Sequence, residues 1–226
     1  MSEHNASMRL NVPILLASLA LSGCVDLPAS DSKQRPVRQS TTVFTDTPSA
    51  RQCLADLGNK AARFTPKPDR YAENGCSALN TVSLSSVMSD QRAVSVANLD
   101  TVGCSAANTF ATWTRFGVDR AARQILGSPL ARVETFGSYA CRNVAGTARR
   151  SAHATASAID IAAFVLEDGR RVTVREGWTG SSQEREFLRV VHRSACKRFG
   201  TVLGPDYNRA HADHFHVEAK QGSFCR

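Results

Sequence analysis

The sequence predicts an α+β domain in which helices pack on a small antiparallel sheet. Two long segments have the apolar spacing of amphipathic helices, and four shorter segments have the apolar runs of strands. Dense turn sequences separate the shorter segments, and one of them, Glu167-Asp168-Gly169, is expected to join two strands as a tight hairpin. Helices mixed with hairpin-linked strands are typical of the α+β class.

Both predicted helices have recognisable ends. The first covers residues 106–126, preceded by a serine and followed by a glycine. The second begins after Ser181, because Glu184 three residues later completes a capping box, and its apolar face continues until Gly200. His192 lies on this second helix, and we expect it on the surface or the flank of the helix.

The predicted strands are short runs bounded by turn-forming residues and rich in β-branched and aromatic residues. They cover residues 132–136, 158–166, 171–174 and 215–219. A second turn cluster, residues 204–208, lies shortly before the last of these strands.

The N-terminal residues 1–23 have the composition of an export signal. One arginine precedes an apolar run, residues 12–21, that is too short to span a bilayer. The sequence L-S-G-C at residues 21–24 resembles the bacterial lipoprotein box, which predicts lipidation of Cys24; an ordinary signal peptide with an incidental cysteine is the alternative. Because Val25 rather than Asp follows the cysteine, we expect a periplasm-facing protein anchored in the outer membrane.

Residues 24–50 are predicted to be a lipidated N-terminus and a disordered tether, since Ser, Thr, Pro and charged residues dominate them. Residues 51–226 have the length of one domain with its own core. The formal net charge of +8 suits anionic envelope material. Export from the cytoplasm argues against nucleic acid as a partner, and the sequence leaves the oligomeric state open.

Cys24 apart, the chain contains six cysteines, and an even number in an exported protein indicates three disulfides. Six cysteines allow fifteen pairings, so the connectivity stays open. Zinc-binding thiols are the alternative, but no two of these cysteines have the close spacing of a zinc knuckle. The six are Cys53, Cys76, Cys104, Cys141, Cys196 and Cys225.

Histidine is concentrated in HADHFH, residues 211–216, which contains three of the six histidines of the chain. Imidazole is the commonest metal ligand and the usual proton carrier near neutral pH. Because side chains alternate along a strand, His214 and His216 are expected to project from one face into a common cavity. A structural zinc knot or a polar surface patch is the alternative.

A third metal ligand must come from elsewhere, and SAHATASAIDIAAF, residues 151–164, is the candidate. His153 lies in a turn of small residues. Asp160 lies on a predicted strand between Ile159 and Ile161, which are expected to face the core. A carboxylate in such a place is costly unless it is paired or bound to an ion.

The pattern S-x-H-x-x-A-x-A-x-D followed by H-x-H resembles the metal signature of the zinc D-Ala-D-Ala peptidase superfamily, which includes murein endopeptidases, D,D-carboxypeptidases and the hedgehog signalling domain. More closely, GSYACR, SAHATASAIDIAAF, the run from FLRVVH to HADHFH and the terminal CR resemble the bacterial extensin-like C-terminal domain family. This similarity covers nearly all of residues 51–226. It implies a disulfide-stapled, hedgehog-like peptidase core.

By this resemblance, zinc (Zn2+) is held by His153, Asp160 and His216. Two nitrogens and one oxygen leave a fourth position for water, the open arrangement that hydrolysis requires. His214 is favoured as the group that manages the proton, then His211, with Asp213 as the residue that orients it; the sequence does not settle these roles.

Arg142 completes the expected site, because relatives carry an arginine in a Ser-Tyr-type turn before the first ligand. Its guanidinium is expected to bind a substrate carboxylate or the developing oxyanion, and Ser138 and Tyr139 are expected to bind substrate beside it; a surface ion pair of Arg142 is the alternative. Ala156 departs from the superfamily, which usually has Gly there, since alanine avoids positive φ. The turn is therefore expected to be remodelled.

These residues together predict a lipid-anchored, zinc-dependent peptidase that hydrolyses stem peptides or cross-links of peptidoglycan, as D,D- or L,D-endopeptidase or carboxypeptidase. Two other classes remain. A cell-wall-binding or signalling module would keep the metal ligands without a working base. A structural envelope protein would owe its order to disulfides.

Overall fold

The computed structural model describes residues 43–220 and 222–226. The predicted signal segment, Cys24 and most of the predicted tether lie outside the described residues. Among the helices that are described, none has both the length and the apolar character required to cross a bilayer.

The described residues confirm the α+β class, and one of the two predicted long helices is longer and less regular than expected. Trp113 ends the α-helical part, and π-helical segments at Thr114–Asp119 and Ala122–Leu126 continue the helix to Gly127, which has φ 71° and ends it. The α-helices are α1 (Pro48–Asn59), α2 (Cys104–Trp113), α3 (Val174–Gly177) and α4 (Ser182–Cys196).

The sheet is much larger than the small antiparallel sheet predicted. Ten strands form it in the order β1-β4-β5-β7-β8-β11-β10-β12, with β6 beside β4 and β9 beside β8, and β2 and β3 pair separately. Most pairs are antiparallel, but β5–β7 and β10–β12 are parallel. The predicted sheet was too small because no strand was assigned before residue 132, nor at residues 201–203 and 224–225.

The strands have the following bounds. They are β1 (Arg63–Lys67), β2 (Arg70–Ala72), β3 (Cys76–Ala78), β4 (Thr81–Met88), β5 (Ala93–Ala97), β6 (Val102–Gly103), β7 (Leu130–Gly137), β8 (Ala158–Leu166), β9 (Arg171–Thr173), β10 (Thr201–Leu203), β11 (Phe215–Glu218) and β12 (Phe224–Cys225). The predicted β8–β9 hairpin is confirmed, since the two strands pair antiparallel across the predicted turn.

Helix α1 begins inside the segment predicted to be a tether. Thr47 caps it by accepting a hydrogen bond from the backbone N–H of Ala50, and Pro48 occupies the first turn, where proline is tolerated. Upstream, the Thr45 hydroxyl donates to Asp69 at 2.5 Å. The folded part of the chain therefore includes residues before the predicted boundary at residue 51.

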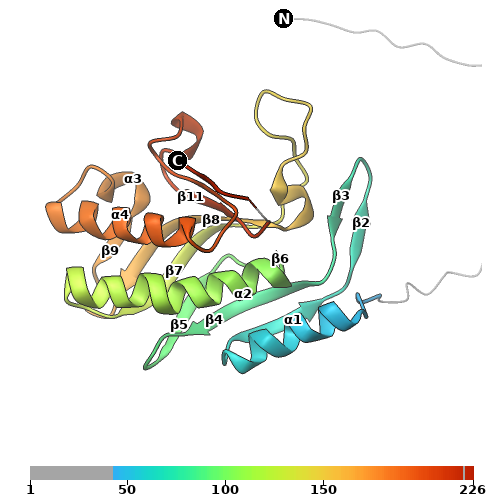
Figure 1. Ribbon diagram of the computed structural model, residues 1–226, viewed down its shortest axis with the longest axis horizontal. Helices are drawn as coiled ribbons and strands as arrows, with labels where there is room; N and C mark the ends of the chain where they lie inside the picture. The colour runs from blue at the N-terminus through green and yellow to red at the C-terminus, as the bar shows by residue number, and fades with distance from the viewer. Residues whose placement is uncertain (1–42, 221) are drawn as a thin grey trace, which may run out of the picture. The chain divides into compact units, whose positions relative to one another are not determined.

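Helix α4 and the long helix that starts with α2 lie side by side over one face of the sheet (Figure 1). The predicted capping box of Ser181 and Glu184 is confirmed at the start of α4. The helix ends at Cys196, four residues before the predicted stop. His192 was expected at the surface or flank but is buried, 8% exposed, between Trp178 and Phe215.

Alternation along the central strands separates the core from the opposite face of the sheet. Ile159 and Ile161 of β8 are fully buried in the core that α2 and α4 cover, as predicted. Phe215 and its neighbour Val217 on β11 point the same way. Asp160 and His216, which lie between them in sequence, therefore project from the face that is turned away from these helices.

Candidate metal centre and its cleft

Three side chains from separate parts of the chain converge on that face. His216 Nδ1 lies 2.9 Å from Asp160 Oδ1, and His153 Nε2 lies 3.1 Å from both His216 Nδ1 and Asp160 Oδ2. Zinc bonds of roughly 2.0–2.2 Å at tetrahedral angles would separate such ligand atoms by about 3.3 Å. The three donors thus fit a single zinc ion after shifts of a few tenths of an ångström.

Strand pairing and a short turn position these donors. Asp160 on β8 and His216 on β11 are direct partners in the antiparallel register. His153 lies in the 3-10 turn Ala152–Thr155, and Ser151 caps this turn by accepting from the backbone N–H of His153. The sequence prediction that these three ligands meet is consistent with the geometry.

A backbone carbonyl fixes the ring of His153. His153 Nδ1 lies 2.5 Å from the carbonyl oxygen of Ser138, so Nδ1 carries the proton and donates it. The lone pair is then on Nε2, the nitrogen that faces Asp160 and His216. Such an outer hydrogen bond is the usual device for fixing the tautomer of a metal-binding histidine.

Glu218 was missed by the sequence interpretation. Its Oε1 lies 3.1 Å from His216 Nε2, on the side of the ring away from Asp160. The available signal was the alternation of β11, because a residue two positions after His216 projects from the same face. A glutamate near a strand end is ordinarily a solvated surface residue, so this signal alone was weak.

The close packing of charges shifts several pKa values. Burial raises the pKa of Asp160, but hydrogen bonds with His153 and His216 outweigh it and hold the pKa below its usual range. Burial lowers the pKa of His216, but Asp160 and Glu218 more than compensate and raise it to about 9. Burial and the neighbouring His214 and His216 lower the pKa of His211 to about 4.

His214 stands beside the cluster with its own carboxylate partner. It precedes β11 instead of lying within it, yet its Nε2 is 3.5 Å from Asp160 Oδ1, on the same side as His216, as predicted. Its Nδ1 donates to Asp213 Oδ1 at 2.8 Å. Asp213 therefore fixes one nitrogen of the His214 ring, and the other nitrogen, Nε2, faces Asp160.

His211 lies farther from the donors. Its Nδ1 is 2.8 Å from Asn208 Oδ1, and its ring centroid is 5.2 Å from that of His214 and 5.7 Å from that of His216. The structure thus brings all three histidines of HADHFH together. Of His211 and His214, the two candidates for the proton-handling group, His214 lies nearer to Asp160.

A cleft of about 500 Å³ opens beside these histidines. His211, His214, His216 and Glu218 line it, and four cations surround them: Arg142, Arg149, Arg150 and Lys220. Arg142 Nη2 is 4.0 Å from Asp160 Oδ2, and its side chain is half exposed. The guanidinium therefore reaches both the donor cluster and the space where a ligand would lie.

Ser138 and Tyr139, predicted to bind substrate, are not among the residues that line this cleft. Ser138 is 5% exposed, and its hydroxyl donates to the carbonyl of Ala156 at 3.2 Å. Its carbonyl oxygen accepts a hydrogen bond from His153 Nδ1, so both polar groups of Ser138 contact the turn that carries His153 and not the cleft. Ser138 therefore acts on the site through His153.

Ala156 adopts a left-handed conformation, which favours glycine over alanine. Its φ is 52° and its ψ is 24°, and the residue is fully buried. Its carbonyl accepts hydrogen bonds from Ser138 and from the backbone N–H of Gly103 at 2.8 Å. The backbone at Ala156 is therefore strained, at about 1 kcal/mol for one alanine in this region.

All six cysteines of the predicted domain form disulfides, as expected, and the structure supplies the pairing. The bonds are Cys53–Cys104, Cys76–Cys141 and Cys196–Cys225. The first joins α1 to α2. The second joins β3 to the residue directly before Arg142, and so limits the movement of the segment that carries this guanidinium.

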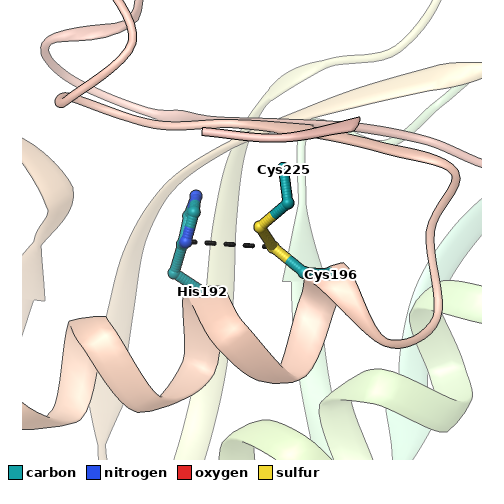
Figure 2. Close-up of side chains that lie close together, drawn as sticks. All are labelled: His192, Cys196 and Cys225. Carbon is teal, nitrogen blue, oxygen red and sulfur yellow. Dashed lines mark hydrogen bonds between the residues drawn. A yellow bond between two sulfur atoms is a disulfide. The ribbon is translucent and has the colours of Figure 1, made fainter. Parts of the chain in front are cut away.

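The Cys196–Cys225 disulfide forms a second cluster with His192 (Figure 2). His192 Nδ1 lies 4.0 Å from Cys196 Sγ. Both sulfur atoms are used in the disulfide, so neither is the thiolate that binds a metal. Of the two groups in the described part of the chain that could hold a metal ion, the one at His153, Asp160 and His216 keeps all three of its donors, since the disulfide uses two of the three in the other group.

The fold and the site define a disulfide-linked α+β domain with a buried donor set of two imidazoles and one carboxylate beside a basic cleft. Residues 51–226 match the family described as Extensin-like protein C-terminus, and the chain belongs to this family. No curated protein and no solved structure gives a significant match.

Proposed function

We propose that this protein is a zinc-dependent peptidase that hydrolyses stem peptides or cross-links of peptidoglycan. The observation that carries the proposal is the convergence of His153, Asp160 and His216 next to an open cleft, because three protein ligands with a free fourth position are the donor set of hydrolytic zinc sites. The relation to the zinc D-Ala-D-Ala peptidase superfamily, with its hedgehog-like core, is part of this proposal.

The residues around the donors supply the proton chemistry. Zinc in this site supplies Lewis acidity to the scissile carbonyl and to the attacking water. His214 accepts the proton of the water on Nε2, because Asp213 holds the proton of the other ring nitrogen. As the peptide C–N bond breaks, His214 passes this proton to the leaving amine. His211 is the second candidate for this role.

The cations of the cleft select an acidic substrate. Stem peptides of peptidoglycan carry free carboxylates, and Arg142 is placed to bind one of them or the developing oxyanion. Bonds that involve D-residues are expected from the superfamily resemblance. A lipid anchor at Cys24, on the periplasmic face of the outer membrane, would bring the domain to its polymeric substrate without nucleic acid as a partner.

The test measures metal and products with the same preparations. The purified protein is analysed for bound zinc, and sacculi are digested with wild type, His216→Ala, His214→Gln and the control Asp90→Asn, whose carboxylate pairs with Arg115 and Arg120 away from the cleft. Mass spectrometry identifies the muropeptides.

We expect one zinc per chain and new muropeptide termini with wild type and the control. His216→Ala loses both metal and products, and His214→Gln keeps the metal and loses the products. If the wild type binds zinc but releases no products, the protein is a wall-binding or signalling module and not a peptidase. No zinc would leave a structural envelope protein held together by its disulfides.

A further inference from the structure

We infer that Glu218 is a positioning residue. Its carboxylate accepts a hydrogen bond from Nε2–H of His216, and this directs the lone pair on Nδ1 of His216 toward the metal. The inference rests on the metal centre of the proposed function. It assigns a role to a residue outside the set of three ligands and outside the residues that handle the proton.

The side chain of Glu218 contacts His216 directly. Glu218 Oε1 is 3.1 Å from His216 Nε2, and both side chains are largely buried, with 22% and 8% of their surfaces exposed. Strand β11 is flanked by β8 and β10, so the backbone of Glu218 is fixed by pairing with Ala158 and Thr201. The carboxylate is therefore held in place by the sheet.

No other ion pair competes for this carboxylate among the described residues. Lys220 and Arg149 lie near enough to influence it electrostatically, but the ion pair within 4.0 Å is the one with His216. Glu218 also binds the ring nitrogen that faces away from Asp160 and His153. It therefore cannot be a further ligand of the same ion.

The consequence for the ring follows from the chemistry of imidazole. With a metal ion between Nδ1 and Asp160, the ring of His216 would be neutral, with one N–H and one lone pair, and the Glu218 carboxylate at Nε2 requires the N–H on that side. The lone pair is then on Nδ1, the nitrogen that lies 2.9 Å from Asp160 and 3.1 Å from His153. His153 is fixed the opposite way round by Ser138, so the two rings present different nitrogens to one point.

The test compares zinc affinity, measured by chelator competition, in wild type, Glu218→Ala and Glu218→Gln. The control is Glu134→Gln, a carboxylate on β7 that pairs with Arg132 and Arg171. Loss of an outer partner of a metal-binding histidine lowers metal affinity by about 10- to 100-fold. We expect this loss in Glu218→Ala and a smaller one in Glu218→Gln, whose amide oxygen still accepts from Nε2–H. The control is expected to equal wild type.

Two spectroscopic measurements separate positioning from a general loss of structure. The visible absorption of bound Co2+ is expected to change in Glu218→Ala and to be restored largely in Glu218→Gln. In the zinc-loaded wild type, nitrogen-15 NMR is expected to show protonated Nε2 and metal-bound Nδ1 at His216, a result that requires no variant to fold.

The outcomes distinguish this inference from the proposal on which it rests. If the wild type binds no zinc, the proposed metal centre is wrong, and the positioning role of Glu218 is wrong with it. A wild type that binds zinc, with equal affinity and an identical Co2+ spectrum in Glu218→Ala, overturns the positioning role and leaves the metal centre standing. Metal bound at Nε2 of His216 overturns it as well.

Discussion

His216 and Asp160 lie directly opposite each other on the antiparallel strands β11 and β8, with His216 Nδ1 2.9 Å from Asp160 Oδ1. The pair joins residues 56 positions apart in the sequence. Because strand register sets the contact, the sheet itself holds these two candidate ligands together. A preorganised site loses little conformational entropy on binding.

Zinc is expected to stabilise the folded state, because the donors meet only there. At a free zinc concentration of 100 times Kd, linkage predicts a gain of about 2.7 kcal/mol in the free energy of unfolding. Asp160→Asn keeps the shape of the side chain but removes the negative charge, so its zinc-dependent gain is expected to disappear. The measurement is chemical denaturation with zinc and with a chelator.

His211→Ala is the matched control for this experiment, since His211 lies in the same cleft but outside the donor set. It is expected to keep the zinc-dependent gain. An equal gain in Asp160→Asn and wild type would mean that zinc stabilises the protein at another place.

Asp119 is expected to be a major stabilising residue of the long helix. Its side chain has no exposed surface, pairs with Arg123 at 2.8 Å and accepts from the backbone N–H of Leu130 at 3.0 Å. Asp119→Ala leaves a partly buried guanidinium and a buried N–H without this partner, and is expected to cost about 3 kcal/mol in the free energy of unfolding.

Asp90 provides the comparison, because it also pairs with two arginines, Arg115 and Arg120, but at the surface. Water replaces its partners, so Asp90→Ala is expected to cost much less. Urea denaturation of both variants gives the two values. Similar losses would show that burial is not what makes the Asp119 pair important.

Much of the site could be predicted because its signals are local. Strand β8 was predicted with its observed bounds, since a run of apolar residues between two turn sequences is typical of a buried strand. Alternation then placed Asp160 opposite to Ile159 and Ile161, which are buried. The capping box at Ser181 is another local signal that the structure confirms.

The remaining features depend on contacts between distant parts of the chain. The parallel pairing of β5 with β7 and the choice among disulfide pairings are set by tertiary packing. The role of Ser138 is exerted by its carbonyl oxygen, which every residue type has. Glu218 was missed and His192 was wrongly placed at the surface, because the burial of these two side chains depends on tertiary packing and cannot be read from the sequence.

The left-handed conformation of Ala156 is expected to be measurable by comparing two substitutions in one turn. Ala154 and Ala156 are both fully buried, but only Ala156 has a positive φ. Changing either to Gly removes the same methyl group and adds the same freedom to the unfolded chain. Ala156→Gly also relieves strain, so it is expected to be more stable than Ala154→Gly by about 1 kcal/mol.

Thermal or urea unfolding of the two variants under identical conditions gives this difference directly. Equal stabilities would mean that the surrounding hydrogen bonds, from Ser138 and Gly103 to the carbonyl of Ala156, remove the strain of the alanine.

His192 is expected to make the domain less stable in mild acid. Burial lowers the pKa of His192, a hydrogen bond with the backbone of Arg226 and the charge of Asp206 offset this only in part, and Arg189 and Arg193 lower the pKa further. Since the folded-state pKa lies below the unfolded value of about 6.5, the unfolded state takes up the proton first. The contribution of neutral His192 to stability is present above about pH 6.5 and is lost as the pH falls through the folded-state pKa.

The measurement is the free energy of unfolding of wild type and His192→Gln from about pH 7.5 to about pH 5, with a chelator present so that metal binding does not contribute. Glutamine does not titrate, so the stability of wild type relative to His192→Gln is expected to fall as the pH falls, whatever the difference at neutral pH. Parallel curves would contradict the prediction, because other groups would then account for the whole acid dependence. Asp206 does not confuse the comparison, since its pKa is lowered, chiefly by the hydrogen bond from Trp178, and it titrates below this range.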